Sequence, residues 1–282
     1  MARIKKPKKQ PAVTFIDLFA GIGGFHIALS NLGAKCVMAC EIDESARGIY
    51  KLNHNPEMMH EDITTLELDA IPDHEVLCAG FPCQLFSQGG FKRGFQDTRG
   101  TLFFNIHQIL KHKKPKAFFL ENVRHIKNHD DGNTMKTIEI CITELGYSFH
   151  SFIVRASDHG LPQHRPRCFM VGFANGQEFS PPKRRELEKT MSDILGGDCP
   201  RDIGFTLRVG GRHSPINGRH NWDGYIVDGD ARRLSTKEAA AMQGFPADFI
   251  FPNSHREAMK QLGNSVAIPA IQDYAEQILT SL

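Results

Sequence analysis

The residue whose type and position most favour chemistry is Cys83. It follows Gly80-Phe81-Pro82, directly after the apolar run from Glu75 to Ala79. A run of that length is typical of a buried strand, and open α/β sheets bind their ligands where strands end. The fixed φ of Pro82 and the permissive φ of Gly80 together can hold one side chain at a set angle. We therefore interpret Cys83 as a candidate nucleophile, although a thiol after a strand can also be a small buried apolar group.

Acidic and cationic side chains follow further along the chain. Glu121 comes after a second apolar run, Ala117 to Leu120, and is expected at the same sheet edge as Cys83. In Gln163-His164-Arg165-Pro166-Arg167 the arginines alternate around a proline, an extended arrangement in which both guanidiniums can point the same way. Arginine in that position suits an anionic or polar substrate edge. From these residues alone, a surface arginine pair is an equally open interpretation.

A glycine turn near the start of the chain predicts a cofactor site. Residues 13–19 are largely β-branched and aromatic, and they run into Ala20-Gly21-Ile22-Gly23-Gly24-Phe25 and a helical pattern that ends near Gly33. Glycines in such a turn let the backbone approach a ligand closely. A second predicted strand, 35–40, ends at Glu41, about 20 residues past the turn, where Rossmann-like sites place a carboxylate on ribose hydroxyls.

The type of cofactor follows from what accompanies the turn. Asp62 falls at the end of a third short strand, so glycine and acidic positions mark three successive strand ends. The sequence lacks the Gly-Lys-Ser/Thr of a phosphate-binding loop, and the glycine spacing differs from that of pyrophosphate binders. A nucleoside cofactor without a phosphate chain fits better, and we predict S-adenosylmethionine.

Composition limits the class of protein. The chain has 282 residues, 40% hydrophobic and 23% charged, which is typical of a soluble globular protein. The net charge of +2 is too small to indicate nucleic acid by itself. No apolar run approaches the roughly 18 residues of a membrane span, and Asp17 interrupts the first apolar run, so we expect a cytoplasmic protein. The seven cysteines show no zinc-binding spacing, so we expect reduced thiols and no metal.

The pattern of elements predicts how the chain is organised. Residues 1–12 form a basic tail, residues 13–174 a catalytic and cofactor-binding domain, residues 175–250 a small loop-rich domain, and residues 251–282 helices that return to the catalytic domain. Between Arg201 and His220 there are four arginines against one acid, which makes this stretch the best candidate for a nucleic-acid face. The glycine-rich segment 88–100 is expected to close over a substrate.

Several motifs in order along the chain resemble those of the DNA (cytosine-5)-methyltransferase family, in its bacterial restriction-modification form. The resemblance covers nearly the whole chain apart from the basic tail and residues 175–232. The segments that carry it are Phe19-Ala20-Gly21-Ile22-Gly23-Gly24, Glu41, Pro82-Cys83-Gln84, Glu121-Asn122-Val123, Gln163-x-Arg165-x-Arg167, Gln243-Gly244-Phe245-Pro246 and Gly263-Asn264-Ser265-Val266.

The resemblance implies a fold and a reaction. The fold is a Rossmann-like S-adenosylmethionine-dependent methyltransferase sheet with a small target-recognition domain. The reaction is methyl transfer to C5 of a cytosine flipped out of double-stranded DNA, through a covalent bond between Cys83 and C6. Glu121 matches the carboxylic acid at N3, and Arg165 is taken as the cation near O2 that stabilises the intermediate.

The resemblance also implies residues for cofactor and DNA. The S-adenosylmethionine pocket is expected to contain Phe19, Gly21, Ile22, Gly23, Glu41, Ile42, Asp62, Ile63, Pro82, Leu102, Asn264 and Val266. DNA contacts are expected from Gln84, Ser87, Arg99, Gln163, Arg167, Arg208, Arg212 and Arg219.

Two other functions compete with this prediction. Transfer-RNA cytosine-5 methyltransferases of the same fold carry Cys-Phe-Thr in their later half, whereas the nearest match here is Cys168-Phe169-Met170. A catalytically silent DNA-binding regulator would not need Cys83, Glu121 and Arg165 together. We therefore expect a DNA (cytosine-5-)-methyltransferase, acting as a monomer, with a restriction endonuclease as its biological companion.

Overall fold

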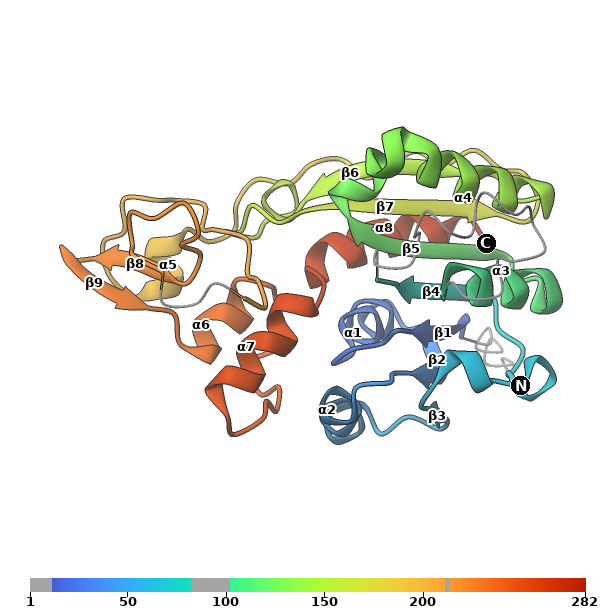
Figure 1. Cartoon of the computed structure of the whole chain (residues 1–282), viewed down its shortest axis with the longest axis horizontal. Coiled ribbons are helices and arrows are strands. Elements are labelled where there is room, and N and C mark those ends of the chain that lie inside the picture. The colour runs from blue at the N-terminus through green and yellow to red at the C-terminus, as the bar shows by residue number, and fades with distance from the viewer. Residues whose placement is uncertain (1–11, 83–101, 211–213) are drawn as a thin grey trace, which may run out of the picture.

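The computed structural model describes residues 12–82, 102–210 and 214–282 (Figure 1). A seven-stranded sheet with helices on both faces forms the larger part, and a smaller lobe with a two-stranded hairpin lies beside it. The α/β sheet predicted from the alternating strand and helix patterns is confirmed.

The strand order brings the predicted functional segments to one edge of the sheet. The strands are β1 (Thr14–Leu18), β2 (Lys35–Cys40), β3 (Met59–His60), β4 (Val76–Gly80), β5 (Ala117–Val123), β6 (His150–Arg155) and β7 (Pro166–Phe173). They lie in the order β3-β2-β1-β4-β5-β7-β6, and all neighbours up to β5 are parallel, while β7 is antiparallel to both β5 and β6. Because parallel strands end at the same edge, the segments that follow β1, β2 and β4 meet there. Glu121 of β5 pairs with Gly80 of β4.

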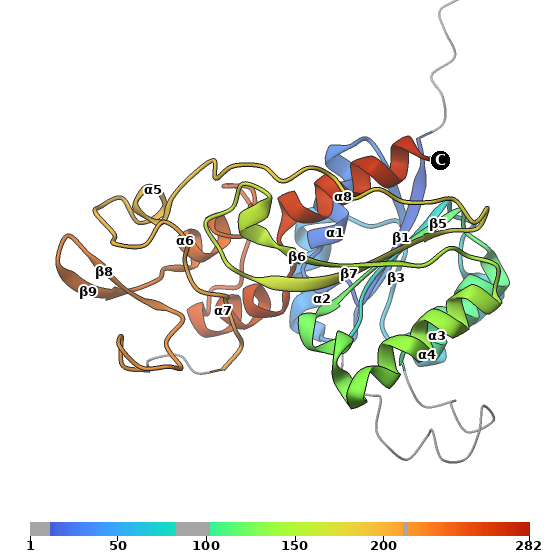
Figure 2. The same cartoon turned by 90° about the horizontal axis from the view of Figure 1, so that it is seen from above.

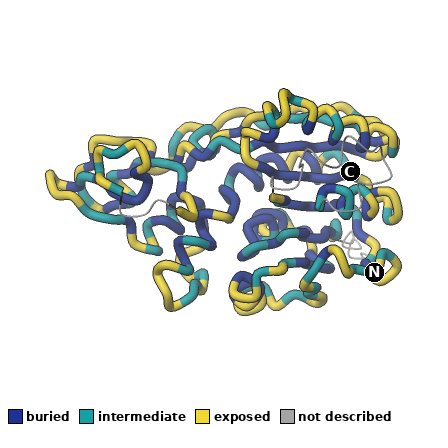
Figure 3. Tube along the Cα trace, viewed as in Figure 1, coloured by how far each residue is buried: buried dark blue, intermediate teal, exposed yellow. Residues whose placement is uncertain are grey.

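Helices cover both faces because the central strands are apolar on both sides. The helices α1 (Gly24–Asn31), α2 (Glu44–His54) and α8 (Ile268–Thr280) lie on one face, and α3 (Leu102–Lys113) and α4 (Asn133–Glu144) lie on the other (Figure 2). Neighbouring side chains of a strand point to opposite faces, so Phe119 joins the first core and Phe118 the second. Figure 3 shows the central strands buried along most of their length, as expected of a parallel sheet covered on both faces.

Local sequence signals set the starts of two helices. The carboxylate of Asp43 accepts a hydrogen bond from the backbone N–H of Ala46, so it caps α2. Ser235 and Glu238 form a capping box at the start of α6 (Thr236–Ala241), with both of its side-chain to backbone hydrogen bonds present. Capping of this kind satisfies backbone N–H groups that the first turn of a helix leaves unpaired.

The smaller lobe contains α5 (Met191–Leu195), β8 (Gly224–Val227), β9 (Asp230–Arg233), α6 and α7 (His255–Asn264) (Figure 1). Trp222 is fully buried, and its indole N–H donates to the carbonyl of Gly210. In the stretch between β7 and α5, Phe179 packs against Phe152 and Tyr274 of the larger part. The apolar side chain of Phe179 therefore keeps the first residues after β7 on the sheet.

The described helices include none that is both long and apolar enough to pass through a bilayer. The described cysteines, Cys36, Cys40, Cys78, Cys141, Cys168 and Cys199, are all buried free thiols.

Candidate active site and cofactor pocket

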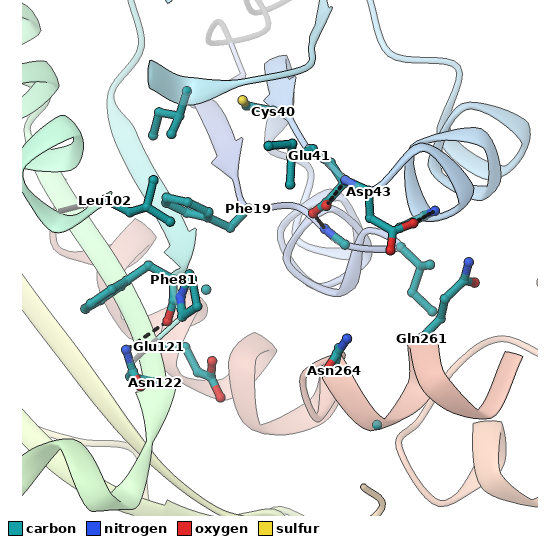
Figure 4. A pocket seen from close by; sticks show the side chains of 18 of the residues that line it. Phe19, Cys40, Glu41, Asp43, Phe81, Leu102, Glu121, Asn122, Gln261 and Asn264 are labelled. Atoms are coloured by element: carbon teal, nitrogen blue, oxygen red, sulfur yellow. Dashed lines mark hydrogen bonds between the residues drawn. The ribbon is translucent and has the colours of Figure 1, made fainter. Parts of the chain in front are cut away.

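A cavity of about 680 Å³ lies at the predicted sheet edge (Figure 4). Residues that follow β1, β2 and β4 form one wall, and the end of α7 forms the opposite wall. Most of the residues predicted for the cofactor line it, namely Phe19, Gly21, Ile22, Glu41, Ile42, Asp62, Ile63, Pro82, Leu102 and Asn264. The same cavity is lined by Glu121 and Arg167.

Glu41 ties the glycine turn to the end of β2. One carboxylate oxygen accepts a hydrogen bond from the backbone N–H of Gly21 at 2.7 Å, and the other accepts from the N–H of Asp43 at 2.8 Å (Figure 4). Burial raises the pKa of Glu41, and these two hydrogen bonds oppose that rise. Each carboxylate oxygen has a second lone pair, so Glu41 can still accept a ligand hydroxyl.

Two further residues suit an adenine ring. Ile42 is a large apolar side chain that is 69% exposed at the cavity, so a planar base could cover it. Asp62 accepts hydrogen bonds from the backbone N–H and the hydroxyl of Thr64, and these bonds lower its pKa. A carboxylate that stays charged is a suitable acceptor for an exocyclic amine. The residues present therefore fit the adenosine half of S-adenosylmethionine.

Two residues predicted for the pocket do not line it. Gly23 begins α1 with a φ of 90°, and a Cβ there would lie 2.1 Å from the Nε2 atom of His54. Val266 packs against the next glycine, Gly24, where a Cβ would lie 2.4 Å from its Cγ2 atom. A side chain at Gly23 would collide with His54, and one at Gly24 would collide with Val266, so only glycine leaves room at these two positions of the turn.

Glu121 and Arg167 form a buried ion pair in the cavity. The Nε atom of Arg167 lies 2.9 Å from Oε1 of Glu121, and the two side chains are 15% and 11% exposed. Burial raises the pKa of Glu121, although the nearby guanidiniums of Arg167 and Arg165 oppose the shift. The site thus presents a carboxyl group whose acid form persists to higher pH than that of an ordinary glutamate, next to a fixed cation.

Arg165 does not reach the cavity, in contrast to its predicted role beside the substrate. Its side chain is almost completely buried, and its guanidinium donates to the backbone carbonyls of Leu207, Gly263 and Ser265. The reason lies in the backbone, because Arg165 precedes β7 and has a φ of 21°, so the alternation expected of an extended segment does not include it. Of the two arginines, only Arg167 lines the cavity.

Comparison with known proteins places the chain in a family. The family model for C-5 cytosine-specific DNA methylases matches residues 13–200 and 199–280. The chain belongs to this family. It is 38% identical over 319 residues to the Type II methyltransferase M.HhaI of Haemophilus parahaemolyticus, covering 98% of this chain and 97% of that protein. It is 39% identical over 329 residues to M.HpaII of Haemophilus parainfluenzae, covering 98% and 92%.

Solved structures share the fold of this methylase at lower identity. The methyltransferase EhMeth of Entamoeba histolytica matches with a TM-score of 0.74 and 18% identity, over 96% of this chain and 99% of that one. The Dnmt2 methyltransferase of S. pombe matches with a TM-score of 0.73 and 20% identity, over 96% and 98%. These likenesses support the predicted methyltransferase fold.

Residues predicted to contact DNA have different surroundings in the methylase. Gln163 is fully buried, its amide donating to the carbonyl of Met242 and accepting from the N–H of Leu207, so it joins segments of the protein and does not face outward. Arg208 and Arg219 are exposed on the smaller lobe. The remaining predicted contacts, and the predicted nucleophile, lie outside the described residues: Cys83, Gln84, Ser87, Arg99 and Arg212.

Asn122 is a site residue to which the sequence assigned no role. It is buried, and its amide donates to the carbonyl of Phe81 at 2.8 Å and accepts from the N–H of Val123 (Figure 4). Phe81 is two residues before the predicted nucleophile Cys83, so Asn122 fixes the backbone that leads toward it.

Replacing Asn122 with alanine is therefore expected to lower kcat by about 10²-fold, the cost of a misplacement of roughly 1 Å in a reacting group. The cofactor should bind nearly as well, because Asn122 is on the side of the cavity away from Glu41. Steady-state kinetics with S-adenosylmethionine would check this, using Asn133→Ala on the surface of α4 as the matched control. A variant with an unchanged kcat would show that the backbone before Cys83 is held by other contacts.

Lys260 and Gln261 also line the cavity and were not predicted. The ammonium of Lys260 lies 2.9 Å from a carboxylate oxygen of Asp43, and the amide of Gln261 donates to the hydroxyl of Ser45. Both stand within one helical turn of Asn264, at i−4 and i−3. That spacing places them on the same face of α7 as Asn264.

Proposed function

We propose that this protein is a DNA (cytosine-5-)-methyltransferase that transfers a methyl group from S-adenosylmethionine to C5 of a cytosine within a short sequence of double-stranded DNA. The observation that carries the proposal is one cavity that holds both the Glu121–Arg167 pair and the residues suited to adenosine. Its wall includes Pro82, the residue directly before Cys83. Membership of the cytosine-specific DNA methylase family supports the same reaction.

The proposed chemistry begins at Cys83, because C5 of cytosine is a weak nucleophile. The thiolate adds to C6, forming an Sγ–C6 bond and making C5 electron-rich. Glu121, whose pKa is raised by burial, donates a proton to N3, where negative charge develops. We assign the cation beside this site to Arg167 and not to Arg165, since Arg167 contacts Glu121 and lines the cavity. Once C5 carries the methyl group that S-adenosylmethionine would supply, a base removes the C5 proton, the Sγ–C6 bond breaks with the thiolate as leaving group, and N3 returns its proton to Glu121.

The cofactor half of the site is proposed to hold S-adenosylmethionine, which when bound supplies the methyl group. Glu41 would accept from the ribose hydroxyls, Ile42 would pack on adenine, and Asp62 would accept from its amine. Gly21 and Asn264 would form opposite walls of this part of the pocket.

Replacing Glu41 with alanine is expected to weaken cofactor binding by roughly 10- to 150-fold, since hydrogen bonds to a charged group are worth about 1.5–3 kcal/mol. The loss combines the ribose contact and the bond that fixes Gly21. Calorimetric titration with S-adenosylhomocysteine would measure the change in Kd. The matched control is Glu44→Ala, one helical turn away on the surface of α2, and equal affinity in the two variants would contradict the assignment.

DNA is proposed to bind across the cavity and the smaller lobe. Chemistry at C5 and C6 requires the base to leave the stack, and the cavity offers the acid and cation to receive it. Arg208 and Arg219 are exposed on the smaller lobe and are proposed to contact phosphates or base edges. Because Phe179 packs on Tyr274 of α8 and Arg185 forms a β-bridge with His159, both in the larger part, we propose that the target-recognition part begins near α5.

The biological setting is proposed from the relatives. They are Type II methyltransferases, so a restriction endonuclease is the proposed companion, with DNA in the bacterial cytoplasm as the substrate. We propose that the protein acts as a monomer, because the residues of a single chain line the whole cavity.

A transfer assay with radiolabelled S-adenosylmethionine tests the proposal. Label is expected in duplex DNA and not in transfer RNA. Label in transfer RNA would favour the RNA methyltransferase. Cofactor binding without transfer to either substrate would favour a silent DNA-binding regulator.

A further inference from the structure

Arg165 donates hydrogen bonds to two parts of the molecule, one proposed to bind DNA and the other lining the cofactor cavity. It donates to the carbonyl of Leu207 at 3.1 Å, in the loop of the smaller lobe that carries Arg208. It also donates to the carbonyls of Gly263, at 3.0 Å, and of Ser265. These last two residues flank Asn264, which lines the cofactor cavity. One buried guanidinium therefore fixes both the backbone of the loop before Arg208 and the backbone on either side of Asn264.

The same two parts also touch directly. A Cβ on Gly263 would lie 2.6 Å from the carbonyl carbon of Arg208 and 2.9 Å from the backbone nitrogen of Val209. The loop backbone therefore rests on the end of α7 with no room for a methyl group between them. Gln163 adds a third tie, accepting a hydrogen bond from the N–H of Leu207.

The surroundings of Arg165 show that this junction is rigid. Burial lowers the pKa of its guanidinium, and the three carbonyls accept hydrogen bonds from its two terminal nitrogens. A planar guanidinium holds several acceptors in a fixed geometry, which the single ammonium of a lysine cannot do. A displacement of the loop therefore has to displace the end of α7 or break these bonds.

We propose that Arg165 and Gly263 couple the two substrates, so that DNA bound at the loop 207–209 tightens the binding of S-adenosylmethionine against Asn264, and the cofactor tightens the binding of DNA. Arg165 is then a positioning residue that contacts neither ligand. This inference rests on the proposed function. Coupling of binding is reciprocal, so either ligand can report it.

The test compares Gly263→Ala with Gly210→Ala. Both variants add one methyl group, and neither glycine has a positive φ, but a Cβ on Gly210 meets no described atom within 4 Å. The Kd of S-adenosylhomocysteine is measured by calorimetry for the free enzyme and for its complex with duplex DNA. The duplex carries the short sequence that the enzyme methylates. In the wild type and in Gly210→Ala, DNA is expected to lower this Kd by about 5- to 150-fold.

In Gly263→Ala the ratio of the two Kd values is expected to approach 1. Arg165→Lys should show the same loss of coupling, and if it does not fold, Gly263→Ala decides alone. A coupling ratio in Gly263→Ala equal to that of the wild type would overturn the inference, as would a wild-type ratio of 1. Either result with normal methylation leaves the proposed function intact, whereas failure of the wild type to methylate DNA overturns that function itself.

Discussion

Replacing Cys83 with serine is expected to lower the rate of methyl transfer by on the order of 10⁴-fold or more, the scale seen when a covalent nucleophile is removed. Serine has nearly the same size, but its hydroxyl is scarcely ionised at neutral pH, so no nucleophile is available to add to C6. DNA binding should remain close to that of the wild type, since phosphate and base-edge contacts come from other residues. Single-turnover transfer and a gel-shift titration would measure the two effects.

A second cysteine provides the control. Cys141 is buried on α4, outside the residues that line the cavity, and Cys141→Ser should keep the wild-type transfer rate. Normal turnover by Cys83→Ser would contradict the covalent mechanism.

Replacing Glu121 with glutamine is expected to lower kcat by about 10²- to 10⁴-fold, the usual contribution of a positioned general acid. The amide keeps the shape of the side chain but cannot transfer a proton to N3. The pH dependence should change as well. Burial raises the pKa of Glu121, so the acid is present below that raised pKa and is lost as the pH rises through it. The logarithm of kcat should therefore fall as the pH rises above this pKa in the wild type, and this fall should be absent in Glu121→Gln.

Rate measurements across pH under saturating substrate would show both effects. The matched control is Glu139→Gln on the exposed surface of α4, which should keep the wild-type rate and profile. A Glu121→Gln variant with the wild-type kcat would contradict the acid role.

Most of the fold could be predicted because local and tertiary signals agree. The central strands are short apolar runs that are buried on both faces, and the residues after them carry the functional motifs. Asp43 and the Ser235–Glu238 box cap helices through contacts within three residues, which sequence spacing can reveal. Helices were predicted within residues 251–282 without their bounds, although Ser254 caps α7 through the backbone N–H of Glu257, again within three residues.

The site was less predictable where it depends on long-range geometry. Arg165 and Arg167 are indistinguishable in sequence, and only the backbone before β7 decides that Arg167 enters the cavity. Gln163 is polar but serves contacts with Met242 and Leu207, more than forty residues away in the chain. Glu41 and Asp62 could be found, since Glu41 directly follows β2 and Asp62 lies two residues after β3, where the edge of a parallel sheet places its ligands.

The most direct test is methylation of a plasmid in cells that express this chain, determined by bisulfite sequencing beside a Cys83→Ala control. The proposed function predicts 5-methylcytosine at one short motif, present with the wild type and absent with Cys83→Ala. It would be contradicted if no cytosine were methylated by a protein that folds and binds S-adenosylmethionine, or if the same motif were methylated by the Cys83→Ala variant.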